Sequence, residues 1–352
     1  MLLLILTLLG ACIGSFLNVV IYRMPRGLSV QKPTRSFCPT CGANIPWRHN
    51  IPLLSWLLLR GRSACCHQPI AARYWLVEAA CTALFFAIGW QFPYETIITQ
   101  LLLCLWCAIM LAMLAMDWEQ MVVEPRLALM AAACGVGAGG MDPALVEGFA
   151  VQPWEGLVWS VGGALGGYLL FRLVALGGRL LFGRRTCRFP ETAEWQLRQV
   201  GEDIVLTAGE KEFLWTQVFM ESTDRLELEN AAIASIPEAQ GRLVFTEDSL
   251  LLPDGSRRSL EEFDHLSGTC SEVRQLREAM GSGDAWLALA IGALCGWQGM
   301  VFALVGGSVI GILFALICRI RRGVPMPFGP SLILAAYLWL FYGPQIIIRL
   351  GF

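Results

Sequence analysis

Residues 97–117 read IITQLLLCLWCAIMLAMLAMD, twenty largely apolar residues followed by an aspartate. A helix of about 20 apolar residues crosses the hydrocarbon core of a bilayer, where each backbone polar group must find its partner within the helix. The stretch therefore predicts a membrane-spanning helix with a carboxylate at its end. The composition of the 352-residue chain agrees, because 56% of the residues are hydrophobic and only 15% are charged. The net charge of −2 gives no sign of a nucleic-acid-binding surface.

Similar apolar stretches occur on both sides of this segment. The opening run MLLLILTLLGACIGSFLNVVIYR has its first basic residue after the apolar part, which indicates a retained helix rather than a cleaved signal peptide. We expect an α-helical polytopic membrane protein with about eight transmembrane helices. Their approximate ranges are 2–21, 75–90, 97–116, 126–140, 156–178, 285–297, 299–318 and 329–348.

The charges between these stretches are segregated by side. Residues 23–73 hold eight Lys and Arg residues and no acidic residue, which predicts a cytoplasmic loop. Counting spans places six more basic residues on that side: Arg126, Arg184, Arg185, Arg319, Arg321 and Arg322. The short loops of the opposite side hold only acidic charges: Glu95, Asp142, Glu147 and Glu155. The pattern predicts an N-terminus outside the cytoplasm.

One long polar segment, residues 183–280, interrupts the apolar pattern. It holds 19 of the 28 acidic and 11 of the 26 basic residues of the chain, and we expect an inserted cytoplasmic domain of mixed α/β structure, rich in strands. RLELE at 225–229 alternates as a strand does, residues 243–263 predict strand, Pro-Asp-Gly turn and strand, and SEVRQLREAM at 271–280 predicts a helix.

The expected organisation has five parts. They are a first helix (1–22), a basic loop with cysteines (23–73), four helices that include Asp117 (74–182), the inserted domain (183–280), and the GSGD sequence with three final helices (281–352).

Two carboxylates at predicted membrane boundaries are candidates for catalysis. Asp117 ends the third apolar stretch, and Asp284 follows Gly281, Ser282 and Gly283 at the start of the sixth. Singly, each is explained as an ordinary interfacial charge, and Asp284 as a favourable charge at a helix N-terminus. If the two carboxyl groups lie close together, one would keep a proton while the other acts as a base, which is the chemistry of aspartic proteolysis. Gly281 and Gly283 would permit close approach of backbone and substrate.

Several motifs resemble those of the type IV prepilin peptidases, relatives of the GxGD membrane aspartyl proteases. They are GSFLNVVIYRMPRG (14–27), CPTCGANIPWRHNIPLLSWLLLRGR (38–62), PIAARYWLVE (69–78), the Asp117 segment, GSGD (281–284) and PFGPSLILAAY (327–337). Together they cover nearly the whole chain outside 183–280. The resemblance implies an enzyme of the bacterial inner membrane that cuts the basic leader from prepilins or pseudopilins at the cytoplasmic face. It identifies Asp117 and Asp284 as the catalytic pair, and implies N-methylation of the new N-terminus with S-adenosylmethionine.

Two departures from the family pattern concern the aspartate segments. The family continues the first segment toward Leu-Pro-Asp, whereas this chain has Val123, Glu124 and Pro125, so that Glu124 is a candidate to replace that carboxylate. A lysine usually follows the second aspartate by two residues, and Trp286 stands there instead.

A third departure concerns metal binding. Cys38 and Cys41, followed by a second cysteine pair, have the form of a four-thiolate zinc site that would stabilise a small loop domain. The second pair reads Ser63-Ala-Cys65-Cys66, so Cys66 matches and a serine replaces the other thiol. Cys65 or His67 could supply the fourth ligand of a structural zinc. The alternative is four reduced cytosolic thiols.

Other functions remain open on the sequence alone. An ion-coupled transporter would also place carboxylates and glycines in its spans, but would leave the basic cysteine loop unexplained. A family member that has lost proteolysis would act as a methyltransferase or as a scaffold for pilus assembly, and the changes at Glu124 and Trp286 are the support for it. Lipid and prepilin or pseudopilin substrates are the expected partners, and the inserted domain could bind an assembly protein.

Overall fold

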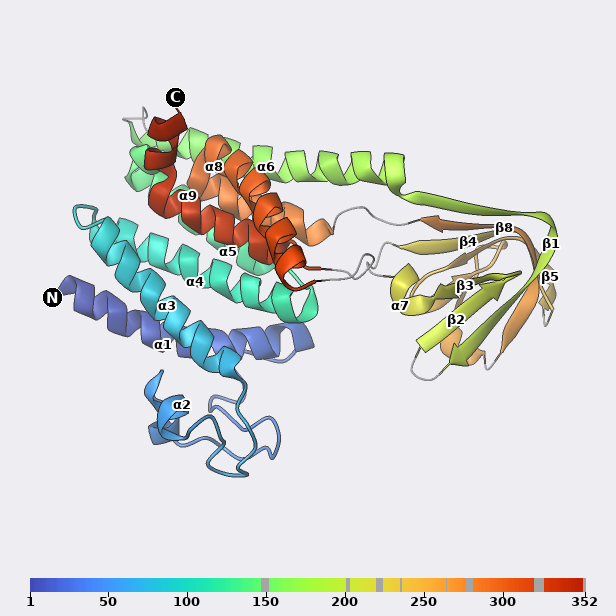
Figure 1. Ribbon diagram of the computed structural model, residues 1–352, viewed down its shortest axis with the longest axis horizontal. Coiled ribbons are helices and arrows are strands. Elements are labelled where there is room, and N and C mark those ends of the chain that lie inside the picture. Colours follow the sequence, from blue (N-terminus) through green and yellow to red (C-terminus); the bar gives the residue numbers. More distant parts are fainter. Residues whose placement is uncertain are drawn as a thin grey trace. The chain divides into compact units, whose positions relative to one another are not determined.

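The computed structural model describes residues 1–146, 152–200, 203–219, 224–234, 236–263, 265–276, 281–319 and 326–350 (Figure 1). Within these residues the chain divides into two compact units. The first comprises Met1–Phe171 with Gly283–Phe352, and the second comprises Arg172–Ser282. Glu147, Arg321 and Arg322, which entered the charge pattern, lie outside the described residues.

The first unit is built from apolar helices. The long ones are α1 (Leu2–Arg23), α3 (Ala72–Gln91), α4 (Ile97–Gln120), α5 (Pro125–Met141), α6 (Pro153–Phe182), α8 (Ser282–Ile317) and α9 (Gly329–Leu350). The last part of α6, from Arg172, belongs to the second unit. Between α1 and α3 the loop holds the 3₁₀ turns Met24–Arg26 and Trp47–His49 and the short helix α2 (Leu54–Leu58), and the 3₁₀ turn Pro143–Leu145 follows α5. Each of the eight predicted apolar stretches is therefore helical.

Five of these helices are long and apolar enough to cross a membrane: α1 with its 3₁₀ turn, α3, α4, α6 and α8. α5 has only 17 residues, and the apolar part of α9 spans Gly329–Gly343. The chain thus has several membrane-crossing helices, while the count of eight stays a prediction.

The predicted sixth and seventh spans are the two halves of α8. Gly296 interrupts the helix with φ 62° and ψ −169°, a conformation that is essentially confined to glycine. Trp106 of α4 donates to the carbonyl of Ala290 before the break, and the Trp118 ring lies 5.0 Å from the Phe314 ring after it. Because Trp118 lies more than three turns beyond Trp106 on α4, the second half of α8 runs back along that helix.

Glycines allow the helices to approach closely. α1 and α3 lie side by side (Figure 1), and a Cβ at Gly14 would stand 2.8 Å from the Glu78 Cα. A Cβ at Gly163 of α6 would collide with the carbonyl of Gly292 in α8. Without a hydrophobic driving force between helices in lipid, such contacts and hydrogen bonds hold a bundle together. One of these bonds runs from the Tyr337 hydroxyl of α9 to the Cys107 carbonyl of α4, at 2.7 Å.

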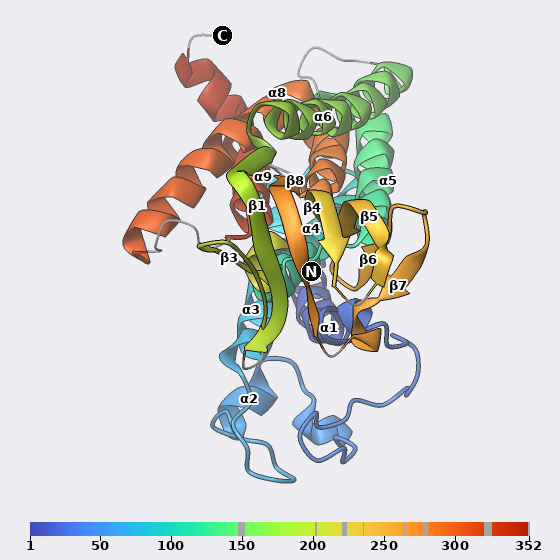
Figure 2. The same ribbon diagram turned by 90° about the vertical axis from the view of Figure 1, so that its right-hand side faces the viewer.

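The second unit contains one antiparallel sheet in the strand order β3-β2-β1-β8-β4-β5-β6-β7 (Figure 2). The strands are β1 (Arg184–Val200), β2 (Asp203–Ala208), β3 (Lys211–Leu214), β4 (Arg225–Ile233), β5 (Ile236–Phe245), β6 (Ser249–Leu251), β7 (Arg257–Ser259) and β8 (Leu266–Leu276). Pro190 lies in β1 where its pairing with β8 shifts between Arg188 and Ala193, as expected for a proline inside a paired strand.

The two faces of the sheet differ in chemistry. One face carries a hydrophobic core in which Trp195 and Phe245 are fully buried with ring centroids 5.8 Å apart. The other carries ion pairs between adjacent strands, Arg188–Glu272, Arg274–Glu229, Glu229–Arg242 and Arg242–Glu227, and one pair within β8, Glu272–Arg274. Along β4, the leucines of RLELE point to the core and the glutamates join the ion pairs, which explains why this sequence forms a strand, as predicted.

The inserted domain corrects two expectations. Its described helical content is the four-residue α7 (Trp215–Val218) and the 3₁₀ turn Leu260–Glu262, so the domain is a sheet rather than a mixed fold. The helix predicted at 271–280 is wrong for Ser271–Leu276, which belong to β8, and residues 277–280 are outside the described part. Val273 points to the core while Glu272 and Arg274 join the ion pairs, and these contacts override the helix-forming tendency of the side chains. The strands on either side of the Pro-Asp-Gly turn, β6 and β7, are confirmed.

Candidate active site

Asp117 lies in the last turn of α4. Its residue is only 6% exposed, and its Oδ2 atom has no hydrogen-bond partner within the described structure. The helix ends four residues later at Met121, whose left-handed backbone (φ 54°) lets its N–H bond to the Asp117 carbonyl at 2.9 Å. A buried carboxylate oxygen without a protein partner is costly unless a water or substrate group meets it.

The first turns of α8 lie close to this carboxylate. A Cβ built on Gly329, the first residue of α9, would collide with Oδ2 of Asp117 and would stand 2.7 Å from Cδ1 of Leu287. Leu287 lies three residues after Asp284, on the same side of α8. Asp117, Leu287 and Gly329 therefore meet at one point, contributed by α4, α8 and α9.

Asp284 lies in the first turn of α8 and is partly exposed. The adjacent Gly283 faces the segment that follows α4, because a Cβ there would stand 2.9 Å from the Cβ of Val123. A glycine at position 283 thus lets the start of α8 approach Val123 closely, whereas Gly281 precedes the helix. The two aspartate segments meet through Val123 and Gly283 on one side and through Leu287 and Gly329 on the other.

The residues that depart from the family pattern have structural partners. Glu124 is the N-cap of α5, and its carboxylate lies 3.7 Å from Nε of Arg126. The ring of Trp286 packs on Tyr168 of α6 with centroids 5.1 Å apart. Trp286 therefore has a packing role between α8 and α6.

Gly329 is the residue of this site to which the sequence assigned no role. It stands in the PFGPSLILAAY motif, but nothing local marks it, because its importance comes from the approach of Asp117 across the bundle. A glycine directly before a Pro at the start of an apolar stretch was the available signal.

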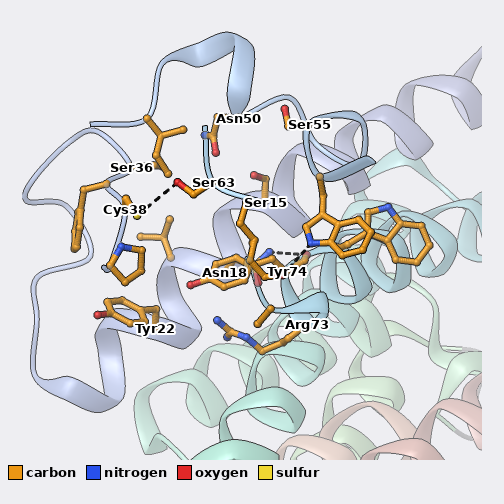
Figure 3. A pocket seen from close by; sticks show the side chains of 18 of the residues that line it. Ser15, Asn18, Tyr22, Ser36, Cys38, Asn50, Ser55, Ser63, Arg73 and Tyr74 are labelled. Carbon is orange, nitrogen blue, oxygen red and sulfur yellow. Dashed lines mark hydrogen bonds between the residues drawn. The ribbon is translucent and has the colours of Figure 1, made fainter. Parts of the chain in front are cut away.

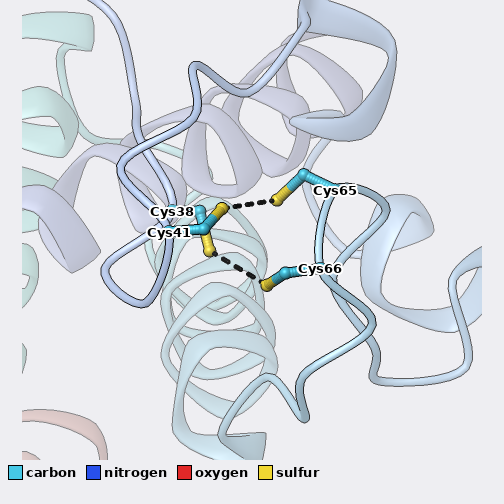
Figure 4. A group of neighbouring side chains, drawn as sticks. All are labelled: Cys38, Cys41, Cys65 and Cys66. Atoms are coloured by element: carbon cyan, nitrogen blue, oxygen red, sulfur yellow. Dashed lines mark hydrogen bonds between the residues drawn. The ribbon is translucent and has the colours of Figure 1, made fainter.

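The second candidate site is the cysteine cluster of the α1–α3 loop. The Sγ atoms of Cys38, Cys41, Cys65 and Cys66 all lie within 4.8 Å of one another (Figure 4). Cys38 and Cys66 are 3.7 Å apart, and Cys41 and Cys65 are 3.3 Å apart. With Zn–S bonds of about 2.3 Å, ligands of a tetrahedral zinc are about 3.8 Å apart. The donor set fits a metal ion such as zinc, with Cys65 as the fourth thiol.

Two similar turns build this cluster. In the first, the N–H of Gly42 bonds to the Cys38 carbonyl at 2.8 Å; in the second, the N–H of His67 bonds to the Ser63 carbonyl at 2.9 Å. Gly42 and His67 both have positive φ, 72° and 57°. Ser63 therefore occupies the position equivalent to Cys38, and the thiol missing there is supplied by Cys65.

The surroundings of Cys38 and Cys41 shift the pKa values of these two thiols in opposite directions. The backbone N–H of Cys41 is the main cause that lowers the pKa of Cys38 from 9.0 to about 6. The N–H of Ala43 lowers the pKa of Cys41, but hydrogen bonding to Cys65, burial and the other neighbouring thiols together raise it to about 12. Thiols this close do not all ionise by themselves, whereas a divalent cation stabilises them all as thiolates.

Two family models match parts of the chain. Residues 8–92 match the bacterial peptidase A24 N-terminal domain, and residues 267–316 match the type IV leader peptidase family. The first range contains the cysteine cluster and the second contains Asp284, while Asp117 lies between them. No solved structure matches the chain.

Curated relatives carry the name prepilin leader peptidase/N-methyltransferase. A protein of Myxococcus xanthus is 40% identical over 51% of this chain, but the match spans only half of that relative's length. A protein of Pseudomonas putida is 26% identical over 97% of this chain and 90% of its own length. A protein of Dickeya chrysanthemi is 34% identical over 52% of this chain and 68% of the relative. With both family models and these matches, the chain belongs to the type IV prepilin leader peptidase/N-methyltransferase family.

Proposed function

We propose that the protein is a membrane aspartic endopeptidase that cuts the leader peptide of type IV prepilins or pseudopilins. The observation that carries this proposal is the meeting of the two aspartate segments at one end of the helix bundle. Asp117 is buried against Gly329 and Leu287, and Asp284 is one turn from Leu287. Family membership and the names of the relatives support the same reaction.

Asp117 and Asp284 would act as an acid–base pair. One carboxylate takes a proton from a water molecule as the water oxygen attacks the scissile carbonyl carbon, and the carboxylic acid protonates the leaving nitrogen as the C–N bond breaks. Asp117 is buried and Asp284 is partly exposed, so the two carboxyl groups have different surroundings. This difference favours a state in which one of them holds a proton and the other is ionised.

The substrate would reach this site along the membrane. A prepilin joins a basic leader to a long apolar helix, so the apolar helix could remain in lipid while the scissile bond meets Asp117 at the cytoplasmic boundary. The charge pattern of the loops supports this orientation in the bacterial inner membrane. Glu124 is available to attract the leader, since its partner Arg126 is largely exposed, whereas Glu119 is held by Arg73 at 2.9 Å.

Three further assignments accompany this function. The four-cysteine cluster would bind a structural zinc that crosslinks the loop between α1 and α3. The name of the relatives supports N-methylation of the new N-terminus, for which S-adenosylmethionine supplies the methyl group. The inserted sheet domain would serve as a docking module for a pilus or secretion assembly protein.

The proposal is tested by leader cleavage of a purified prepilin in membranes that contain the wild-type chain, Asp117→Asn or Asp284→Asn at matched expression. Both variants should lose cleavage, because neither amide can replace an acid–base carboxyl group. Asp142→Asn is the matched control, since Asp142 caps the far end of α5. A single aspartate variant that still cleaves, or a wild-type chain that does not, would contradict the proposal.

A further inference from the structure

A short apolar stretch lies within the basic loop between α1 and α3. Residues 51–59 read IPLLSWLLL, contain no charged residue and are too few to cross a bilayer. They include the short helix α2, in which Leu54, Leu57 and Leu58 are between 53% and 77% exposed. Helix residues three and four positions apart are neighbours, so these three side chains form one patch, the leucine face of α2. Exposed apolar patches on proteins mark contacts with a partner or with a membrane.

The opposite side of α2 is turned toward the protein and is more polar. Ser55 is buried, and the Trp56 indole donates to the Ile70 carbonyl at 3.3 Å. Both residues line a cavity of about 450 Å³, whose wall also includes Asn18 of α1 and Tyr74 of α3 (Figure 3). A helix on the surface of a water-soluble protein turns its apolar side inward. In α2 the serine is inside and the leucines are outside, which is the orientation expected in lipid.

Hydrogen bonding joins this stretch to the membrane-spanning helices at a level within their spans. The N–H of Leu53, the residue before α2, donates to the carboxylate of Glu78 at 2.7 Å. Glu78 is the seventh residue of α3, about 9 Å along the helix from its start. A Cβ on Gly14 would stand 2.8 Å from the Cα of Glu78, and Gly14 lies nine residues before the end of α1. Because α1 and α3 are both long and apolar enough to cross a membrane, the stretch adjoins parts of them that lie in the bilayer.

The backbone before α2 makes its hydrogen bonds within the protein, as a segment in lipid must. The N–H of Ile51 donates to the Ser55 hydroxyl at 2.7 Å, and the N–H of Ser55 donates to the Ile51 carbonyl at 3.0 Å. The N–H of Leu54 donates to the Pro52 carbonyl at 2.6 Å, and a proline has no N–H of its own. With Leu53 bonded as described above, each N–H from residue 51 to residue 55 has a partner in the protein. No water is needed to satisfy this part of the backbone.

The residues that flank the stretch suit the headgroup region of a bilayer. Trp47 and Arg48 precede it, Arg60 and Arg62 follow it, and all four are exposed. Tryptophan is typical of the membrane–water interface, and arginine is attracted to anionic lipid. The three arginines would repel the basic leader of a prepilin, so on the proposed function the substrate fits this surface less well than lipid does.

We propose that residues 51–59 are a lipid anchor, in which the leucine face of α2 enters the acyl-chain region beside α1 and α3 while the flanking arginines meet anionic phospholipid headgroups. The second turn of the cysteine cluster begins at Ser63, four residues after Leu59. The anchor therefore holds the cysteine cluster at the membrane surface. The inference goes beyond the proposed function, because it concerns the lipid and not the substrate.

The test places the photo-crosslinking amino acid p-benzoylphenylalanine at position 58 of the full chain, in nanodiscs of phosphatidylethanolamine and phosphatidylglycerol. Leu58 is exposed and therefore tolerates the replacement. After illumination, the mass of the intact chain should show a lipid adduct in about the yield obtained at Leu105, an exposed residue within α4. Glu210, exposed in the sheet unit, is the control position and should give about tenfold less adduct, because burial of a leucine in lipid favours contact with lipid by at least that factor.

The outcomes at position 58 decide between lipid and a peptide partner. An adduct yield no higher than at Glu210 would overturn the inference. A prepilin adduct that replaces the lipid adduct when purified prepilin is added would overturn it as well, since the leucine face would then be a substrate surface. Leader cleavage is not used in the measurement, so its result is independent of the proposed function.

The role of the arginines is tested separately by the double change Arg60→Gln with Arg62→Gln. In nanodiscs with phosphatidylglycerol, this change should lower the lipid adduct at position 58 about twofold or more, because two attractions to anionic lipid are lost. In nanodiscs of phosphatidylcholine alone, whose headgroups have no net charge, the yield should stay the same. An equal yield before and after the change in both lipids would contradict the pairing of these arginines with anionic headgroups.

Discussion

Asp117 owes its surroundings to residues that are distant in the sequence. Its carboxylate meets Gly329 of α9 and shares that contact with Leu287 of α8. No hydrogen bond of the protein satisfies its Oδ2 atom within the described residues. The site thus depends on a position where even one methyl group is too large.

Gly329→Ala should therefore reduce leader cleavage by about 10²-fold, because displacement of a catalytic group by about 1 Å has an effect of that size. Gly162→Ala is the matched control, since a Cβ at Gly162 meets no atom within 4 Å. Both variants are compared for initial cleavage rates at equal amounts of folded protein. Equal rates for the two variants would mean that the Asp117 carboxylate tolerates the methyl group.

The cysteine cluster gives a second prediction for single residues. Cys65→Ser should lose bound zinc, and the double change Ser63→Cys with Cys65→Ser should regain it, because Ser63 occupies the turn position equivalent to Cys38. The zinc content of the purified chain, measured by mass spectrometry of the metal, decides the matter. A wild-type chain without zinc, or a Cys65→Ser chain with a full complement, would exclude Cys65 as a ligand.

The sequence identified these residues unevenly. Cys38, Cys41, Cys65 and Cys66 were recognisable because four thiols lie in two short clusters of one loop. Asn18, Arg73 and Gly329 could not be assigned a role, since each lies in an apolar or ordinary stretch and acquires its partners only when helices pack. A local sequence pattern is enough to identify a set of metal ligands, whereas residues that meet across the bundle can be identified only from the fold.

Among the elements, the helices were predictable and the last strand was not. Long apolar stretches fix the helix positions, because lipid permits little else. In α8, the helix is interrupted at Gly296, near the end of the predicted span 285–297. In β8, Glu272 and Arg274 favour a helix locally, but their partners on β1 and β4 determine the strand.

The ion pairs across these strands predict a dependence of stability on pH. Hydrogen bonding to Arg274 is the main cause that lowers the pKa of Glu272 below its ordinary value of 4.5. A group with a lowered pKa in the folded state contributes stability above its unfolded pKa and loses it as the pH falls through the folded value. Residues 183–280, expressed alone, should therefore become easier to unfold in urea below about pH 4.5.

Glu272→Gln should lower the stability of that domain at pH 7 and flatten its pH dependence in the acid range. Glu210→Gln serves as the control, because Glu210 is an exposed residue of the turn between β2 and β3. If Glu272→Gln follows the wild-type curve at every pH, the ion pairs on this face do not contribute to stability.

At the scale of the molecule, the chain combines two units with separate cores. The sheet unit has its own buried cluster around Trp195 and Phe245, and the proposed catalytic and binding residues all belong to the helical unit. A unit with a core of its own is expected to fold alone. We therefore propose that the insertion is an addition to the peptidase unit and contributes no residue to its active site.

Replacement of residues 183–280 by a short Gly/Ser linker should leave cleavage of purified prepilin within about threefold of the wild-type rate, because no residue of the proposed site is removed. Pilus assembly in cells should fall if the sheet docks an assembly protein. Cleavage of purified substrate and assembly are measured on the same chain, and loss of both would identify the insertion as a gate for the active site.

The hydrogen bonds from Trp106 to Ala290 and from Tyr337 to Cys107 tie α4 to the last two helices of the chain. Synthesis on the ribosome produces α4 before the inserted domain and α9, so Asp117 waits in the membrane until α9 has been made. On the proposed function, a product of interrupted translation that lacks α9 is then a harmless membrane protein, and precursors are cut only by chains that carry α9.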